Sequence, residues 1–130
     1  MLKISKLTDY GLILLTELKE DEVLSASFLS NKTQIPLATT NKILKKLLAK
    51  KICHSKYGKT GGFFLNKPHN NISILEVINC IEDIPTHFTE CSNTHNQCQL
   101  KNNCKISSKM KLIDKEIHSI LSKKFISDLI

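Results

Sequence analysis

The sequence predicts a mainly α-helical fold with a small β wing, and three observations predict it. Apolar residues recur at helical spacing in three segments of the first 51 residues, in a fourth near residue 75 and in a long one near the C-terminus. A Gly-rich stretch, Gly58–Gly62, separates two short extended segments. Gly and Pro are otherwise scarce and 41% of the residues are hydrophobic, which fits one small domain with an appendage.

The first helix is expected over residues 5–19. Ser5 or Thr8 can cap it, and Asp9 favours its first turn. Four residues at positions i, i+3, i+7 and i+11 are expected to form its apolar face: Leu7, Tyr10, Leu14 and Leu18.

A short second helix is expected over 25–34, and a third over 37–51. Ile35 and Pro36 separate them, because the residue before proline avoids the helical region and proline suits a helix entry. The buried stripe of the third helix should contain Leu37, Ile43, Leu44, Leu47 and Leu48. Its other side should carry Thr39, Thr40, Asn41, Lys42, Lys45 and Lys46. A short helix, a turn and a lysine-bearing helix are typical of a helix-turn-helix.

A two-stranded hairpin is expected over residues 52–57 and 63–66. Its glycines permit positive φ and close approach to a phosphate backbone, and Lys56 and Lys59 flank its tip. A hairpin in this place is the wing of a winged helix; an ordinary surface hairpin is the alternative.

The remaining chain predicts a fourth helix over 71–82 and a last helix over 105–124. The last helix has a long apolar stripe, formed by Ile106, Met110, Ile113, Ile117, Ile120 and Leu121. We interpret it as a dimerisation helix; packing on its own domain is the alternative. The tail 125–130 is apolar enough to dock.

The positive charge is confined to the N-terminal half. Residues 1–69 carry twelve Lys against five Asp or Glu, and residues 70–130 carry seven of each sign. This distribution favours a polyanionic partner, with a solvated lysine-rich surface as the alternative. No Arg is present, so phosphate contacts should dominate over base contacts from basic side chains.

Three cysteines, Cys91, Cys98 and Cys104, lie in a polar segment with six and five residues between them. Thiolates grouped in this way suit an iron–sulfur cluster or a soft metal, with one ligand missing from the usual four. Zinc bound with His95 or His87, a disulfide and a redox thiol remain alternatives. Cys53 and Cys80 are expected to be buried apolar residues, and His54, His69 and His118 to be surface or capping residues.

Other functional classes find little support. No C-x-x-C, Gly-rich nucleotide loop or nucleophile with a base is visible, so we do not expect an enzyme. No apolar run approaches a membrane span, and no signal peptide precedes the first helix. We therefore expect a soluble cytoplasmic protein with reduced cysteines.

Several stretches together resemble one family, the iron–sulfur-sensing winged-helix regulators of the IscR and NsrR type. They are the opening Met1–Gly11, the wing Gly58–Leu65, the fourth helix, the three-cysteine segment and the long final helix. The opening is most similar to the branch that regulates the SUF cluster-assembly operon. The resemblance covers essentially the whole chain and implies a homodimeric transcription factor, mostly a repressor, that binds operator DNA.

The resemblance also implies a cluster, either 2Fe–2S or 4Fe–4S, at Cys91, Cys98 and Cys104. Where one branch has a histidine as fourth ligand, this chain has Ser107. Asp9 matches the position from which, in another branch, the partner subunit supplies an aspartate. His95 is a further candidate.

The expected organisation follows from these assignments. Four parts are expected: a winged-helix DNA-binding domain, 1–69; a connecting helix and linker, 70–90; a cluster-binding loop, 91–104; and a dimerisation helix with its tail, 105–130. The expected DNA contacts are Ser25, Ser27, Ala38, Thr39, Thr40, Asn41, Lys42, Lys45, Lys46, Lys56, Lys59, Thr60 and Gly61.

Overall fold

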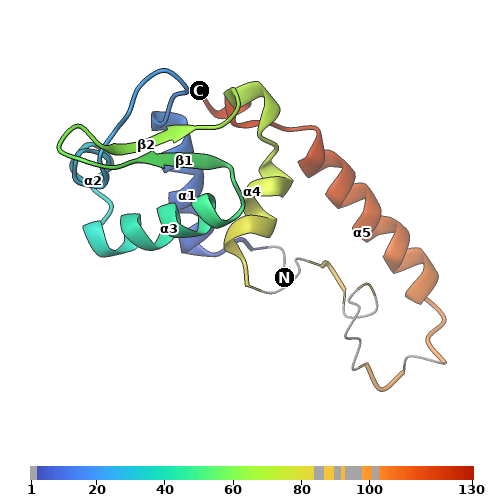
Figure 1. Cartoon of the computed structure of the whole chain (residues 1–130). Helices are drawn as coiled ribbons and strands as arrows, with labels where there is room; N and C mark the ends of the chain where they lie inside the picture. The colour runs from blue at the N-terminus through green and yellow to red at the C-terminus, as the bar shows by residue number, and fades with distance from the viewer. Residues whose placement is uncertain (1–2, 84–86, 90–91, 93–97, 101–102) are drawn as a thin grey trace.

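The computed structural model describes residues 3–83, 87–89, 92, 98–100 and 103–130. A winged-helix body forms one side of the molecule, and α5 extends from it as an arm (Figure 1). The elements are α1 (Lys6–Glu17), α2 (Ala26–Thr33), α3 (Leu37–Ala49), β1 (Cys53–Lys56), β2 (Gly62–Leu65), η1 (His69–Asn71), α4 (Ile74–Ile81), α5 (Ser107–Ser122) and η3 (Ile126–Leu129). The mainly helical fold with a two-stranded wing is confirmed, although η1 and Ser73 replace the first turn of the predicted fourth helix.

The core lies where α1, α3 and α4 meet one another. Its fully or almost fully buried side chains include Leu14, Leu15, Leu18, Ile43, Leu44, Leu47, Val77 and Ile81. Burying each such side chain stabilises the fold by about 1.5–3 kcal/mol. Gly11 permits the approach of α1 to α4, because a Cβ at this position would clash with the side chain of Ile81.

Serine begins three of the helices. Ser5, Ser25 and Ser73 each accept a hydrogen bond from a backbone N–H in the first turn of α1, α2 and α4, respectively. Such a cap contributes about 1 kcal/mol. Pro36 stands at the N-cap of α3, as predicted from its fixed φ.

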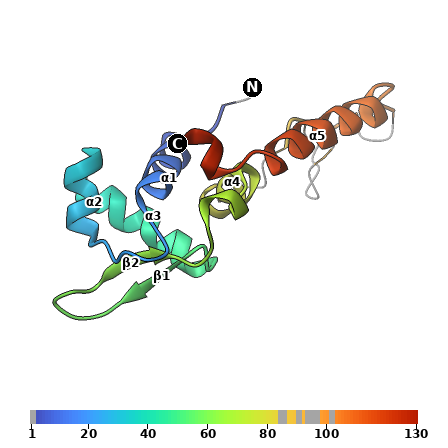
Figure 2. The ribbon, with the colours of Figure 1, turned by 90° about the horizontal axis from the view of Figure 1, so that it is seen from above.

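The wing is an antiparallel pair in which Cys53 lies opposite Leu65 and Lys56 opposite Gly62. Gly58 has a φ of 106° in the turn, a conformation that side chains rarely adopt. Leu24 adds a bridge to Phe63, with N···O distances of 3.0 and 2.7 Å, and so attaches the entry of α2 to β2. The wing tip and α5 lie at opposite ends of the molecule (Figure 2).

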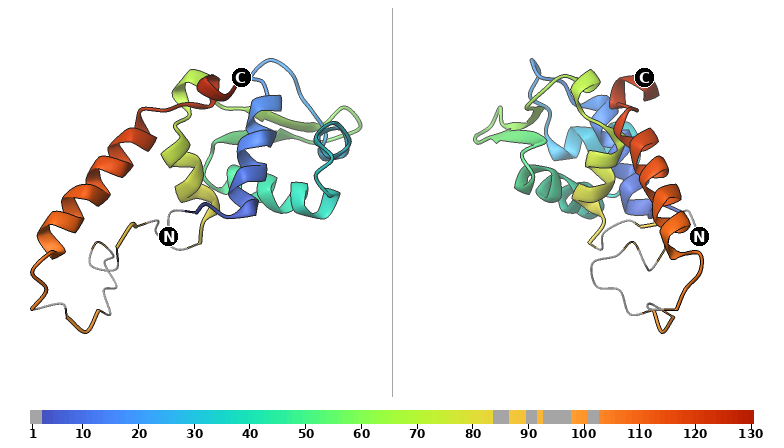
Figure 3. Two further views of the ribbon diagram at one scale, coloured as in Figure 1. Left: turned by 180° about the vertical axis from the view of Figure 1, so that it is seen from behind. Right: turned by 90° about the vertical axis from the view of Figure 1, so that its right-hand side faces the viewer.

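The C-terminal tail returns to the winged-helix body (Figure 3). Ile126 is 0% exposed, and its N–H donates to Ile72 O at 2.9 Å. Ile74 N–H donates to Lys124 O at 2.8 Å. The predicted docking of the tail is therefore confirmed.

Two predictions about the faces of α3 are wrong. Thr40 is 0% exposed because it lies on the same stripe as Ile43, Leu44 and Leu47, at positions i, i+3, i+4 and i+7. Its hydroxyl donates to Ile35 O at 3.4 Å. Leu37 is 44% exposed, since it begins the helix at the edge of the core.

No helix in the described residues is long and apolar enough to cross a membrane.

Candidate nucleic-acid interface and metal centres

The outer face of α3 is small, polar and positively charged. Ala38, Asn41, Lys42 and Lys45 are exposed and Thr39 is half-buried. Two lysines beside short side chains give a surface that can contact phosphates while the helix approaches base edges.

Two members of the predicted DNA-contact set are engaged inside the protein. Thr40 is buried, so its side chain is not available for a DNA contact. Lys46 Nζ lies 2.6 Å from Asp83 Oδ1 and 3.1 Å from Ile81 O, and its side chain is only 22% exposed. The Lys46 ammonium holds the pKa of Asp83 below its ordinary value. In this conformation Lys46 joins α3 to the end of α4.

The wing presents a second positive surface. Lys56, Lys59 and Thr60 are exposed, and Gly61 is half-buried. Tyr57, which is not among the predicted DNA contacts, is 93% exposed beside the turn. Its place between Lys56 and the Gly-rich turn could have indicated an exposed aromatic side chain on the wing. At the entry of α2, Ser27 is exposed and the Ser25 hydroxyl accepts from Phe28 N–H at 3.1 Å.

The residue after α4 ties the start of α1 to the point where the chain leaves the winged helix. Glu82 Oε1 accepts hydrogen bonds from Thr8 Oγ1 at 2.7 Å and from Ser5 N–H at 3.0 Å. The hydrogen bond from Thr8 is the main reason why the pKa of Glu82 is lowered. With the Lys46–Asp83 pair, these contacts form what we call the α4 exit junction: Ser5, Thr8, Lys46, Ile81, Glu82 and Asp83.

The cysteines fall into two groups. Cys53 is 0% exposed and Cys80 9%, which confirms their predicted burial. Burial raises the pKa of Cys53 to about 12 and also raises that of Cys80, whose thiol donates to Lys46 O at 3.3 Å. Protonated buried thiols are poor metal ligands.

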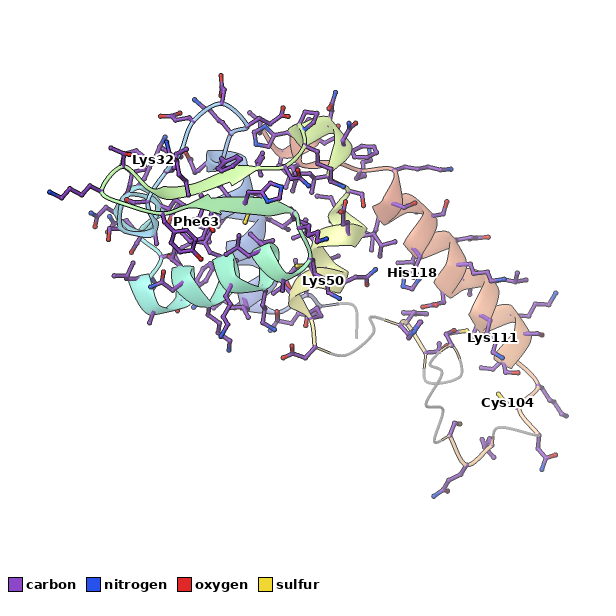
Figure 4. The ribbon with its side chains drawn as sticks, in the orientation of Figure 1. Lys32, Lys50, Phe63, Cys104, Lys111 and His118 are labelled. Carbon is purple, nitrogen blue, oxygen red and sulfur yellow. The ribbon has the colours of Figure 1, made fainter. Side chains whose placement is uncertain are left out.

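Of the predicted cluster ligands, Cys98 and Cys104 are described and half-buried, and Cys91 and His95 lie outside the described residues. Cys104 lies beyond the N-terminal end of α5, away from the winged helix (Figure 4). Asp9 is exposed on α1. Within the described ranges, neither Cys98 nor Cys104 shares a group of three potential ligands.

A different group of three potential ligands is present. His87, Asp114 and His118 offer ligand atoms that all lie within 4.8 Å of one another. Asp114 Oδ2 lies 3.2 Å from His87 Nδ1 and 3.9 Å from His118 Nδ1. His118 is thus half-buried in a polar cluster, and not simply a surface residue. The i,i+4 spacing of Asp114 and His118 could have indicated two of the three members, but His87 is distant in sequence.

Residues 4–130 match the Rrf2 family, which is described as an iron-dependent transcriptional regulator. This chain belongs to the Rrf2 family. The predicted resemblance is therefore confirmed at the level of the family, while the similarity to the SUF branch stays a prediction. The prediction of a regulator in place of an enzyme is also confirmed, because the Rrf2 family consists of transcriptional regulators.

A curated relative supports the same assignment over part of the chain. The putative HTH-type transcriptional regulator YffB of Lactococcus lactis is 36% identical over 73 residues. The match covers 56% of this Rrf2 chain and 47% of YffB. The matched region thus spans about half the length of this relative.

Solved structures show the same fold. CymR of B. subtilis, titled the global cysteine regulator, has a TM-score of 0.76 and 18% identity, covering 99% of this chain and 96% of CymR. IscR of T. potens has a TM-score of 0.70 and 17% identity, covering 98% and 85% of the two chains. The oxidized form of Staphylococcus aureus CymR has a TM-score of 0.71 and 17% identity, covering 98% and 95%.

Proposed function

We propose that this Rrf2-family chain is a homodimeric, DNA-binding transcriptional repressor controlled by an iron–sulfur cluster at Cys91, Cys98 and Cys104. Genes of iron–sulfur cluster assembly are its proposed targets. One observation carries the proposal: the match to an iron-dependent regulator family covers both the winged helix and the three-cysteine segment. The proposed division keeps the boundaries 1–69, 70–90, 91–104 and 105–130.

The DNA contacts are proposed on three elements. On α3, Lys42 and Lys45 contact phosphates while Ala38, Thr39 and Asn41 face base edges. The wing contributes Lys56, Lys59, Thr60 and the amide of Gly61, and the entry of α2 contributes Ser25 and Ser27. These residues are exposed, apart from the half-buried Thr39 and Gly61, and this exposure supports the assignment. Lys46 is assigned to the α4 exit junction instead, because it is paired with Asp83.

The donor chemistry of the cysteine segment fits a cluster. Three cysteines in a polar segment of the sequence suit iron, whereas the two core thiols are held protonated by burial. Asp9 of the partner subunit, or His95, is the proposed fourth ligand. A bound cluster supplies a redox-active centre that oxidants can destroy. The residues of this chain would hold the cluster and couple its binding to the position of the DNA-binding helices.

The α4 exit junction gives a physical route from the cysteine segment to DNA. Asp83 lies eight residues before Cys91 and holds Lys46 of α3, while Glu82 holds the start of α1. A displacement of the cysteine segment therefore acts on both helices. Coupling of about 1–3 kcal/mol is enough to change operator occupancy.

The exposed stripe of α5 supports a dimer. Ile106, Ile113 and Ile120 are 60%, 41% and 61% exposed, respectively, and are spaced seven residues apart. Apolar residues at heptad spacing on a free helix face favour a helix–helix contact. In the dimer, two α3 helices would enter successive major grooves, about 34–36 Å apart.

The test compares operator binding with and without the cluster. Anaerobically reconstituted protein, chelated protein and a Cys98→Ser/Cys104→Ser variant are titrated onto inverted-repeat operator DNA in a gel shift. We expect about 5- to 150-fold tighter binding by the reconstituted protein, or a changed site preference. Cys53→Ser is the matched control, since it removes a buried thiol that is not a proposed ligand. Identical affinity and preference in all forms would exclude the switch.

A zinc- or thiol-based regulator is the second candidate. Cysteines grouped in this way, with a histidine nearby in sequence, also suit zinc or a redox thiol. Iron and acid-labile sulfide analysis of the anaerobic protein separates the two candidates. Zinc without sulfide supports the second candidate.

A further inference from the structure

We propose that His87, Asp114 and His118 bind a divalent first-row transition ion of the Zn²⁺ or Fe²⁺ kind, at a site separate from the cysteines. Two imidazoles and one carboxylate are borderline donors that suit these ions better than Mg²⁺ or Ca²⁺. The set leaves at least one coordination position for water. This site goes beyond the proposed function and does not depend on it.

The distances are close to those of a ligated site. Ligands bound at about 2.0–2.2 Å in a tetrahedron lie roughly 3.3–3.6 Å from one another. Asp114 Oδ2 is 3.2 Å from His87 Nδ1 and 3.9 Å from His118 Nδ1. Small side-chain rotations would therefore place the donors around one ion.

The carboxylate is held in an orientation that suits ligation. Asp114 Oδ1 accepts the Phe88 N–H at 2.6 Å, which directs Oδ2 toward the two imidazoles. A hydrogen bond to the second oxygen is the usual support of a ligating carboxylate. Although burial opposes ionisation, the Phe88 N–H and the two imidazoles hold the pKa of Asp114 below its ordinary value.

The buried residue of α5 is a carboxylate and not an apolar side chain. Among the residues of α5, the buried one is Asp114, at 4% exposure, while Ile113 and Ile120 of the same helix are exposed. Figure 4 shows His118 projecting from α5 toward the winged-helix side. His87 and Phe88 thus contact α5 through hydrogen bonds to Asp114. A bound ion would join the linker to the arm.

The experiment uses tag-free full-length protein in which Cys91, Cys98 and Cys104 are replaced by serine. Co²⁺ is titrated and followed by its visible absorption, which reports nitrogen and oxygen ligation without thiolate charge-transfer bands. We expect saturation at one Co²⁺ per chain and displacement by Zn²⁺. In this background, His118→Ala should weaken binding by at least about 10- to 100-fold. His54→Ala, which removes an exposed histidine of β1, should leave binding unchanged.

A second variant and a second measurement distinguish the loss of a ligand from misfolding of His118→Ala. Asp114→Asn keeps the shape of the side chain but supplies a poor ligand, and it should also lose Co²⁺ binding. Zn²⁺ should raise the urea midpoint of the triple-serine protein but not that of either variant made in it. Absence of saturable binding, or equal affinity in folded His118→Ala, would overturn the site. A failed cluster switch would not affect this result, because the three proposed cluster cysteines are replaced in the assay protein.

Discussion

Glu82 shows how much of the architecture one side chain can hold. Its Oε1 accepts from Thr8 Oγ1 and from the Ser5 N–H, 74 and 77 residues away in sequence. Thr8 is 0% exposed, so its hydroxyl has few other partners. The N-cap role of Ser5 could be predicted from local sequence, but the contact with Glu82 could not, because it depends on the packing of α1 against α4.

The charge of Glu82 should stabilise the fold in a pH-dependent way. Glu82→Gln keeps an acceptor but removes the charge, and we expect it to lower the free energy of unfolding by about 1 kcal/mol at pH 7. The pKa of Glu82 is lowered in the folded state, so its contribution is present above the ordinary carboxyl pKa of about 4.3 and is lost as pH falls through the folded pKa. Urea unfolding at pH 7, 4 and 3 measures the difference.

Glu20→Gln is the matched control, because Glu20 is an exposed acid in the loop after α1. It should have little effect at any of these pH values. A Glu82→Gln deficit that stays constant down to pH 3 would contradict the role of the charge.

At the scale of the element, α3 combines two tasks. Its outer face carries Lys42 and Lys45, while Lys46 and the buried Thr40 attach it to the rest of the fold. The helix itself, its proline entry and most of its stripe could be predicted from periodicity. The burial of Thr40 could have been predicted as well, because the residues three, four and seven positions after it are apolar and lie on the same face of the helix. The pairing of Lys46 with Asp83 was not, because the two are far apart in sequence.

The two lysines should therefore respond differently to substitution. We expect Lys42→Ala to weaken binding to all DNA sequences and to reduce the salt slope of binding by about 1, as loss of one phosphate contact does. Lys46→Ala should change the salt slope less and the stability more, because it removes the ion pair to Asp83. Fluorescence anisotropy across a salt series and urea unfolding measure both effects. An equal reduction of the slope by the two variants would show that Lys46 leaves Asp83 on DNA.

At the scale of the whole molecule, the winged-helix body could be predicted from the sequence more completely than the surroundings of α5. The body, its wing and the docked tail agree with expectations from local patterns and turn chemistry. The apolar stripe of α5 could be predicted from periodicity as well. In the structure Ile106, Ile113 and Ile120 of this stripe are exposed, whereas its other three members are half-buried and α5 contacts α4. The cluster of His87, Asp114 and His118 could not be predicted, because the linker had no periodicity to place it.

A charge on the exposed stripe should separate the proposed dimer. We expect Ile113→Glu to give monomers at micromolar concentration and to weaken operator binding, since a carboxylate cannot be buried in an apolar helix contact without a partner. Ser119→Glu, at an exposed position of the same helix, is the matched control. Sedimentation velocity measures the assembly state. A dimer that persists in folded Ile113→Glu would place the contact between subunits elsewhere.

The docked tail gives α5 a fixed pivot. Ile126 in the core and the backbone bonds of Lys124 and Ile126 anchor the C-terminal end of the helix, while its N-terminal end follows Cys104. A helix of 16 residues is about 24 Å long. A tilt of about 10° around this anchor would move the N-terminal end of α5, next to Cys104, by roughly 4 Å.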